Sequence, residues 1–290
     1  MRWRLWLLIA PALALLLALF IAPLLHYLWL SGHAQSVVTG LEPRPVGAQQ
    51  WLRLLNDGRF WQDAGQTLRF AVCSVGLELI LGLAMALLLH QPIRGRAAIR
   101  TITLLPWALP TTVMALGWRW IFNDPYGPIN QVLQALGLQP VGFLANPALT
   151  WLALVWADTW KTTPFVALLL LAGLQTIPED LYDAARLEGA TRWQCLWRIT
   201  LPLLVPYLLI ALLFRLAQAL GVFDLIQVLS GGGPAGSTES LALYAYLNAM
   251  RFLDFGYSAT ITLGSFVLLV LLGGIGAVLW RWRPLAGEWR

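Results

Sequence analysis

Charged side chains occur inside apolar stretches of this sequence that are otherwise suited to lipid. They are Arg69, Glu78, Arg119, Asp158, Lys161 and Arg215. A charge near the centre of a bilayer costs at least about 2.5–3.5 kcal/mol on insertion scales, so such a residue usually faces a cavity or a partner. Asp158 and Lys161 are three residues apart on one predicted helix and can pair with each other. Arg69 and Arg119 lie close enough to helix ends to reach the headgroups.

The segment around Asp158 brings together an acid, a base and two indoles. A carboxylate accepts hydrogen bonds from two hydroxyl groups, and an indole face stacks on the apolar C–H side of a sugar ring. Trp156, Asp158, Trp160 and Lys161 therefore suit a sugar better than a lipid-facing surface would. They are predicted to line a solute pocket.

Other kinds of chemistry lack the residues that they need. His26, His33 and His90 show no metal-ligand spacing, so they are interpreted as polar residues near the membrane interface. An intramembrane hydrolase needs a nucleophile with a base, and no spanning run combines a histidine with a suitably placed Ser or Cys. Lys161 is the only lysine, and the glycine loop of a P-loop does not precede it. Any ATP must therefore be hydrolysed by another subunit.

The composition indicates that lipid is the solvent of this chain. Of its 290 residues, 59% are hydrophobic and 11% are charged, against roughly 25% charged in a soluble domain. The basic residues behind the net charge of +5 are scattered in ones and twos, which argues against nucleic-acid binding. Six runs have the length of about 20 helical residues that crosses a bilayer. They lie near residues 5–30, 66–90, 99–122, 149–175, 203–225 and 259–281.

The first run and the arginines predict the topology. The first run is too long for the apolar region of a signal peptide, so it is expected to be a retained helix. With both termini in the cytoplasm, eleven arginines fall on the cytoplasmic side and four on the outer side. This bias follows the positive-inside rule and agrees with the even number of spans. Six helices are few to enclose a path, so a homo- or heterodimer is expected.

The polar segment Gln175–Pro202 is too long for a plain connection between two spans. Pro178 suits the first position of a helix, and Glu179 and Asp180 place negative charge at its positive end. Gly189 follows where a left-handed C-terminal residue is needed. A first short helix is therefore predicted before Gly189.

A second helix is predicted to start at Thr191, where Gln194 completes a capping box, and to stop before Pro202 and Pro206. A short rigid helix held off the membrane by defined turns suits docking into a groove of another protein. Acidic residues over 179–188 argue against a helix that lies on the anionic inner leaflet.

This segment resembles the E-A-A-x-x-x-G-x(9)-I-x-L-P coupling motif of binding-protein-dependent ABC transporter permeases. Asp183 stands where the family usually has Glu, and Glu188 where it usually has Asp. The matching residues are Asp183-Ala184-Ala185, Gly189 and Ile199-Thr200-Leu201-Pro202. Further segments resemble the carbohydrate (maltose-type) importer branch, so that about residues 65–282 match one permease domain. They are Trp160–Phe165, Ala172–Pro178, Ser230–Pro234 and Asp254–Tyr257.

The resemblance implies an all-α integral membrane protein with the type I ABC importer permease fold, six transmembrane helices and both termini in the cytoplasm. Residues 1–64 would form the first helix and a periplasmic loop. Residues 65–282 would form the permease domain, with the coupling helix at about 178–190. Residues 283–290 would form a cytoplasmic tail.

The resemblance also implies partners and site residues. Two separate ATPase subunits would bind ATP and Mg, and this chain would be non-catalytic, without its own cofactor or metal. The assembly would lie in a prokaryotic inner membrane, in contact with membrane lipid and without nucleic acid. It would also contain a second permease, expected to be a different chain, and a periplasmic solute-binding protein. Coupling to the ATPase would involve Asp183, Ala184, Ala185, Glu188, Gly189 and Pro202. Aligned on the motif, solute contacts would fall on Asp158, Lys161, Thr162, Phe165, Arg215, Gln218, Ala219 and Val222, beside Trp156 and Trp160.

The expected function is therefore that of a permease subunit of an ATP-driven importer for a sugar, glycoside or polyol. A permease for a sugar-phosphate such as a glycerol phosphate is an alternative, because Arg215 beside Lys161 would suit a phosphate. A secondary transporter is a second alternative, although such carriers usually show an internal repeat in their hydropathy, which is not seen. A membrane-embedded enzyme is a third.

Overall fold

The computed structural model describes residues 10–92 and 94–281. Its contacts divide the chain into two compact units, residues 1–64 with 241–290 and residues 65–240. The predicted boundary between residues 64 and 65 stays a prediction. Residues 241–282, however, group with the first unit. The assignment of one permease domain over 65–282 stays a prediction, and the predicted tail at 283–290 lies outside the described residues.

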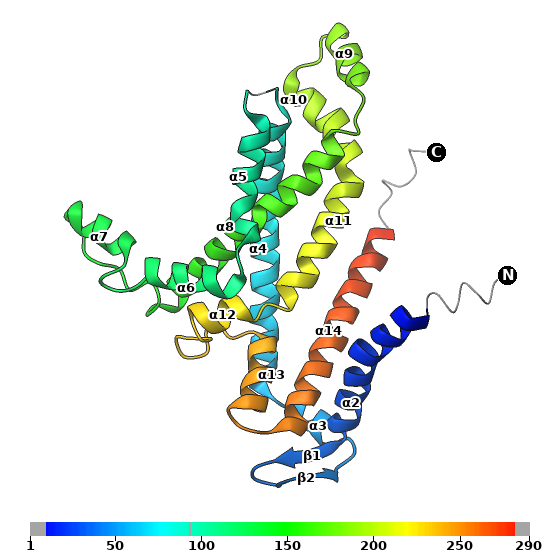
Figure 1. Ribbon diagram of the computed structural model, residues 1–290, viewed down its shortest axis with the longest axis vertical. Coiled ribbons are helices and arrows are strands. Elements are labelled where there is room, and N and C mark those ends of the chain that lie inside the picture. Colours follow the sequence, from blue (N-terminus) through cyan, green and yellow to red (C-terminus); the bar gives the residue numbers. More distant parts are fainter. Residues whose placement is uncertain (1–9, 93, 282–290) are drawn as a thin grey trace, which may run out of the picture. The chain divides into compact units, whose positions relative to one another are not determined.

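The first unit combines a long apolar helix, a β-hairpin and three further helical pieces (Figure 1). The long helix covers Ala10–Ser31 and includes a π turn, η1 (Leu17–Ile21), and α2 (Ala22–Ser31). Strands β1 (His33–Ser36) and β2 (Gly40–Pro45) pair antiparallel, with His33 opposite Pro45. The other pieces are α3 (Gln49–Leu55) with the start of α4 (Gly58–His90), α13 (Leu241–Met250) and α14 (Phe255–Arg281).

The core of the first unit holds α3 and the start of α4 against α13 and α14. Leu54 and Phe60 pack with Tyr257 and Ile261, and all four side chains are buried. A Cβ at Gly264 would lie 2.5 Å from Leu54, so α14 needs a glycine where α3 approaches it. This packing fixes α3 and the start of α4, which follow the hairpin, against α13 and α14.

The second unit is helical over its described residues and is built around α4, α8 and α11 (Figure 1). Its helices beyond α4 are α5 (Arg96–Ala108), α6 (Thr111–Ile121), α7 (Pro128–Ala135), α8 (Pro147–Leu174), α9 (Glu179–Leu187), α10 (Arg192–Cys195), η2 (Leu196–Thr200), α11 (Leu201–Leu220) and α12 (Asp224–Leu229). Val166 and Leu170 of α8 pack with Leu204 of α11 in a core that also contains residues of α4. A Cβ at Gly173 would lie 2.6 Å from the Tyr207 ring, so this glycine permits close packing of α8 and α11.

The structure confirms part of the predicted membrane topology. Over the described residues, three helices are long and apolar enough to cross a membrane, or up to five if each of two bent pairs counts as one span. The predicted span 99–122 is wrong as a single helix, because α5 and α6 meet at an angle of 88°. Pro110 causes this break, since a residue before proline is driven into an extended conformation, as Leu109 is with ψ 138°. Six spans and two cytoplasmic termini stay predictions.

The segment between α8 and α11 differs from its prediction at two prolines. Pro178 is the N-cap residue of α9 and not its first helical residue. The second helix does not stop before Pro202 but runs from Arg192 through the π turn η2 to Leu220. Pro202 is tolerated because it lies in the first turn of α11, directly after η2.

Candidate functional site

A buried ionic cluster joins α4, α8 and α11 in the second unit. It consists of Glu78, Asp158 and Arg215. Arg215 Nε lies 2.5 Å from Glu78 Oε2, and Nη2 lies 2.8 Å from Glu78 Oε1 and 3.1 Å from Asp158 Oδ2. Glu78 is 0% exposed and Arg215 is 3% exposed. One guanidinium therefore bridges two carboxylates that come from two other helices.

Two hydroxyl side chains complete the hydrogen bonds of the ionic cluster. Ser74 Oγ lies 2.8 Å from Glu78 Oε1 and 2.5 Å from Asp158 Oδ2. Thr162 Oγ1 lies 2.6 Å from Glu78 Oε1 and 2.6 Å from the carbonyl oxygen of Asp158. Each hydroxyl has one hydrogen to donate, so it serves one acceptor at a time. Ser74 was not predicted from the sequence, although its position four residues before Glu78 places both on one face of a helix.

The ionic cluster uses every nitrogen of the Arg215 side chain. Its Nη1 donates to Gln218 Oε1 at 2.5 Å, while Nε and Nη2 serve the carboxylates. The predicted pairing of Asp158 with Lys161 is replaced by a pair with Arg215, the ion-pair partner of Asp158 among the described residues. A planar guanidinium from another helix can bridge two carboxylates, which the single ammonium of Lys161 does less well.

The predicted solute residues fall into an accessible set and an engaged set. Trp156 and Trp160 are 60% and 41% exposed, and Gln218 is also exposed. Asp158 and Arg215 are buried in the ionic cluster. The remaining members are half-buried Lys161, Phe165 and Val222 and buried Thr162 and Ala219. Solute contact by any of them stays a prediction, and the accessible set could make it without rearrangement.

The described residues offer no cluster for a metal ion. Within 10–92 and 94–281, no three His, Cys, Asp or Glu side chains come together in a way that could hold one. The two acids of the ionic cluster are instead bridged by Arg215. The described site is thus one of ion pairs, amides and aromatic rings.

The segment predicted to couple to an ATPase forms a short helix with a defined end. α9 begins after Pro178 and ends before Gly189, which has φ +81°. The Ala190 N–H donates to the Ala185 carbonyl at 2.9 Å, and the Gly189 N–H donates to the Arg186 carbonyl at 3.0 Å. These two bonds form a Schellman motif, which requires the left-handed residue that the sequence predicted at this position.

The surface of α9 is open. None of its residues is buried, and Leu187 is 91% exposed. In Figure 1, α9 lies beyond the ends of α8 and α11. The Tyr182 hydroxyl lies 2.9 Å from Thr200 Oγ1, which ties α9 to the turn before α11. The predicted coupling residues lie on or beside this helix, apart from Pro202 in α11, and they are Asp183, Ala184, Ala185, Glu188 and Gly189.

The capping box predicted for the second helix is confirmed. The Thr191 side chain accepts from the Gln194 N–H at 3.3 Å, and Gln194 Oε1 accepts from the Thr191 N–H at 2.7 Å. The exposed indoles of Trp193 and Trp197 follow on the same helix, with ring centroids 5.7 Å apart. The predicted coupling segment therefore exposes both acidic and aromatic side chains.

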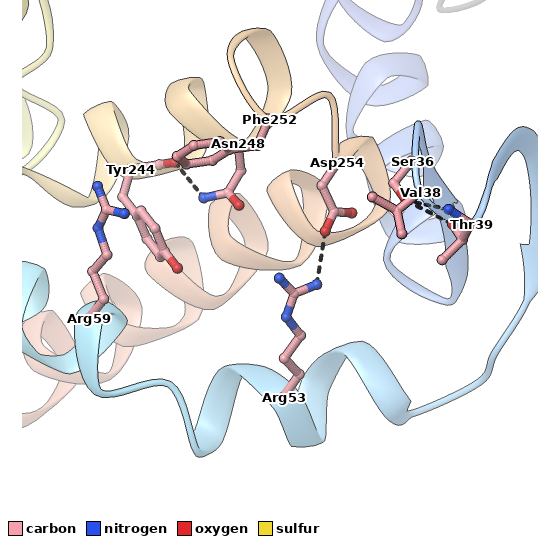
Figure 2. A pocket seen from close by; sticks show the side chains of 9 residues that line it. All are labelled: Ser36, Val38, Thr39, Arg53, Arg59, Tyr244, Asn248, Phe252 and Asp254. Atoms are coloured by element: carbon pink, nitrogen blue, oxygen red, sulfur yellow. Dashed lines mark hydrogen bonds and ion pairs between the residues drawn. The ribbon is translucent and has the colours of Figure 1, made fainter.

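The first unit contains an open cavity of about 450 Å³ near the hairpin (Figure 2). Arg53 Nη1 lies 2.8 Å from Asp254 Oδ2, and the Arg59 guanidinium lies 4.8 Å from the centre of the Tyr244 ring. The Val37 N–H donates to the Leu253 carbonyl at 3.3 Å, which fixes the hairpin beside the α13–α14 turn. The lining residues are Ser36, Val38, Thr39, Arg53, Arg59, Tyr244, Asn248, Phe252 and Asp254.

Asp57, just before α4, anchors the same unit. The Tyr244 hydroxyl donates to Asp57 Oδ2 at 2.6 Å, and the Tyr257 hydroxyl donates to the same oxygen. Burial raises the pKa of the Asp57 carboxyl, but these bonds and the N–H groups of Arg59 and Phe60 hold the pKa below its ordinary value of 3.8. Asp57 therefore stabilises the folded unit as a carboxylate.

We expect acid to destabilise the protein partly through Asp57. A carboxyl whose pKa is lowered by folding contributes its full stability above the ordinary value and loses it as pH falls through the lower folded value. Asp57→Asn should therefore reduce the loss of apparent Tm between pH 5 and pH 2, measured by scanning fluorimetry in detergent. Asp183→Asn, at an exposed acid of α9, is the control. An unchanged acid slope in Asp57→Asn would contradict this role.

Comparison with known proteins identifies the family. Residues 78–282 match the family described as "binding-protein-dependent transport system inner membrane component". This match covers more than half of the chain, and the chain belongs to this family. The resemblance predicted from the coupling motif is thereby confirmed. The protein is a multi-pass component of a prokaryotic inner membrane.

Named relatives and solved structures agree with this assignment. The trehalose/maltose transport system permease protein MalF of Thermococcus litoralis is 44% identical over 266 residues, which cover 91% of this chain and 89% of the relative. The sulfoquinovosyl glycerol transport system permease protein SmoG of Agrobacterium fabrum is 36% identical over 277 residues, or 92% and 90% of the two chains. These relatives are permeases of sugar transport systems.

A solved structure shows the same fold. A chain of a bacterial alginate ABC transporter, in complex with an alginate pentasaccharide-bound periplasmic protein, superposes with a TM-score of 0.81 over 93% of this chain and 91% of that chain. The sequences are 24% identical, so the comparison concerns the fold alone. A second alginate transporter structure gives a TM-score of 0.83 at 24% identity.

Proposed function

We propose that this chain is a non-catalytic permease subunit of an ATP-driven importer and forms part of the path for a sugar, glycoside or polyol. The observation that carries the proposal is α9, an exposed helix of fixed length closed by a Schellman motif at Gly189. Although Tyr182 packs against the core of the second unit, most of α9 is left open, and its rigid ends suit a groove in another protein. ATP and Mg would bind to the ATPase subunits at that groove.

The solute class rests on the relatives and on the chemistry of α8. The named relatives transport trehalose or maltose and sulfoquinovosyl glycerol. Trp156 and Trp160 expose aromatic faces on which a sugar ring can stack, and Gln218 offers an amide for hydroxyl groups. The sugar-phosphate alternative loses its main support, because Arg215 is fully engaged with its neighbours in the ionic cluster.

The cavity of the first unit suits a docking surface for the periplasmic binding protein. Val38 is 94% exposed, and Phe252 is also exposed, beside the paired charges of Arg53 and Asp254. Protein interfaces commonly combine apolar side chains at their centre with polar and charged groups at their rim. Under the predicted orientation, the hairpin after the first span faces the periplasm.

Co-purification tests this function. The chain, isolated from its native membrane in mild detergent, should bring along an ATPase subunit and a second permease, identified by mass spectrometry. The binding protein of the same system can then be screened against sugars by thermal shift. Isolation of the chain alone, together with failure of added ATPase subunits to form a complex, would count against the role of α9.

A further inference from the structure

The carboxyl group of Glu78 pairs with the guanidinium of Arg215 in the ionic cluster. Glu78 is not among the residues that the sequence assigned to solute binding, yet it makes two of the shortest contacts of Arg215, at 2.5 and 2.8 Å. Arg215 lies 137 residues away along the chain and on another helix. Gln218 is exposed and is bonded to Arg215 Nη1. Without Glu78, the guanidinium beside Gln218 would lose the carboxylate that pairs with its Nε and Nη2.

The charges around this point carry no positive excess. Glu78 and Asp158 contribute two acids, and Arg215 and half-buried Lys161 contribute two bases. The exposed acid Asp224 on α12 lies near enough to Lys161 to interact with it and adds a third acid, which is unchanged in the variants described below. A set of charges without a positive excess offers little net attraction to an anion.

We propose that Glu78 is a specificity-determining residue that makes this path select uncharged over anionic sugars. This inference rests on the proposed function. Glu78 acts through Arg215: it occupies two of the guanidinium nitrogens, so that the Gln218 amide, and not a free cation, is presented at the surface of the cluster. A neutral sugar then meets hydrogen-bonding groups and indole faces. An anionic sugar would need a cation that the two acids already hold.

The fold alone leaves this preference open. A solved transporter of the same fold takes part in the import of alginate, an acidic polysaccharide. Selection between neutral and anionic sugars must therefore depend on side chains. In this chain, the acids that set the charge of the cluster are the two that pair with Arg215, Glu78 and Asp158. Removing one acid changes the balance by one unit, and removing both changes it by two.

Binding of a matched pair of probes tests the proposal. Trehalose is the neutral probe and trehalose 6-phosphate is the anionic probe, measured by saturation-transfer NMR on the assembled permease in nanodiscs without binding protein. Glu78→Gln and Asp158→Asn each remove one negative charge, at a different position of the cluster. The double variant removes two. Ser74→Ala is the control, because it removes hydrogen bonds from the same cluster without changing its charge.

We expect the affinity for trehalose 6-phosphate relative to that for trehalose to rise about tenfold at each step of this series, whereas Ser74→Ala should keep the ratio of the parent. Higher salt should weaken the gain. Retained trehalose binding also shows that a variant is folded. If neither single variant nor the double variant gains affinity for the anionic probe, the proposal is overturned. Absence of trehalose binding in the parent would instead contradict the proposed solute class, and the anionic series would still decide the role of Glu78.

Discussion

Replacement of Arg215 by methionine should destabilise this protein more than other single changes in the ionic cluster. Glu78 and Asp158 would remain buried without the guanidinium that joins them. Breaking a buried ion pair by removing one partner costs about 3–5 kcal/mol, because an uncompensated charge stays in a medium of low dielectric. The expected result is a large fall in apparent Tm and in the yield of folded protein, measured by scanning fluorimetry and size-exclusion chromatography in detergent.

Arg119→Met is the matched control for this change. Arg119 also lies in an apolar stretch, but it is exposed and donates one bond of 3.2 Å to the Val228 carbonyl. Its loss should cost far less. Adding Glu78→Gln and Asp158→Asn to Arg215→Met should recover much of the stability, because neutral amides can share hydrogen bonds without leaving a buried charge. Equal and small effects of Arg215→Met and Arg119→Met would show that the cluster is not a stabilising element.

Replacement of Gly189 by leucine should abolish most ATP-coupled uptake while leaving the protein inserted in the membrane. A Cβ at Gly189 meets nothing within 4 Å in this chain, so the new side chain causes no internal clash. The φ of +81° costs an L-residue about 1–2 kcal/mol, and the leucine would also project into the proposed ATPase groove. A cost of about 1.4 kcal/mol changes an equilibrium constant tenfold. The population of α9 with the docked end conformation, and with it uptake, should therefore fall roughly tenfold or more. Uptake by membrane vesicles and the amount of inserted protein are measured together.

Gly189→Asn separates the two causes. Asparagine tolerates the left-handed conformation better than other side chains, so the Schellman motif should survive. This variant should therefore keep more uptake than Gly189→Leu. Full uptake by Gly189→Leu would contradict a docked coupling helix. Equal loss in both variants would assign the effect to side-chain bulk at the partner surface.

The coupling segment was the part of the chain that local sequence rules predicted best. Gly189 as the left-handed residue and Thr191 with Gln194 as a capping box were both confirmed. Helix ends depend on hydrogen bonds within a few residues, so a sequence window contains the necessary information. The two errors there concerned Pro178 and Pro202, whose effect depends on whether the first turn of a helix includes them.

The apolar runs were also predictable, but their continuity was not. Composition alone indicated several spanning helices, and α4 and α8 formed close to the predicted ranges. The run 99–122 has the length and hydropathy of one span, yet Pro110 breaks it into α5 and α6. Not every proline in these runs breaks a helix: Pro106, Pro164 and Pro206 lie inside helices. Neighbouring helices decide which of these a helix accommodates.

By itself, the sequence determined the membrane class, the family and the left-handed residue Gly189 that ends α9, because these depend on composition and on spacing over a few residues. The tertiary structure decided which charged side chains form ion pairs. Helical spacing favoured a pair between Asp158 and Lys161, whereas the fold brings Arg215 to Asp158 across 57 residues and to Glu78 across 137. Sequence distance gives no measure of such contacts. They exist because α4, α8 and α11 pack closely and bury their polar groups together, where each charge must find a partner.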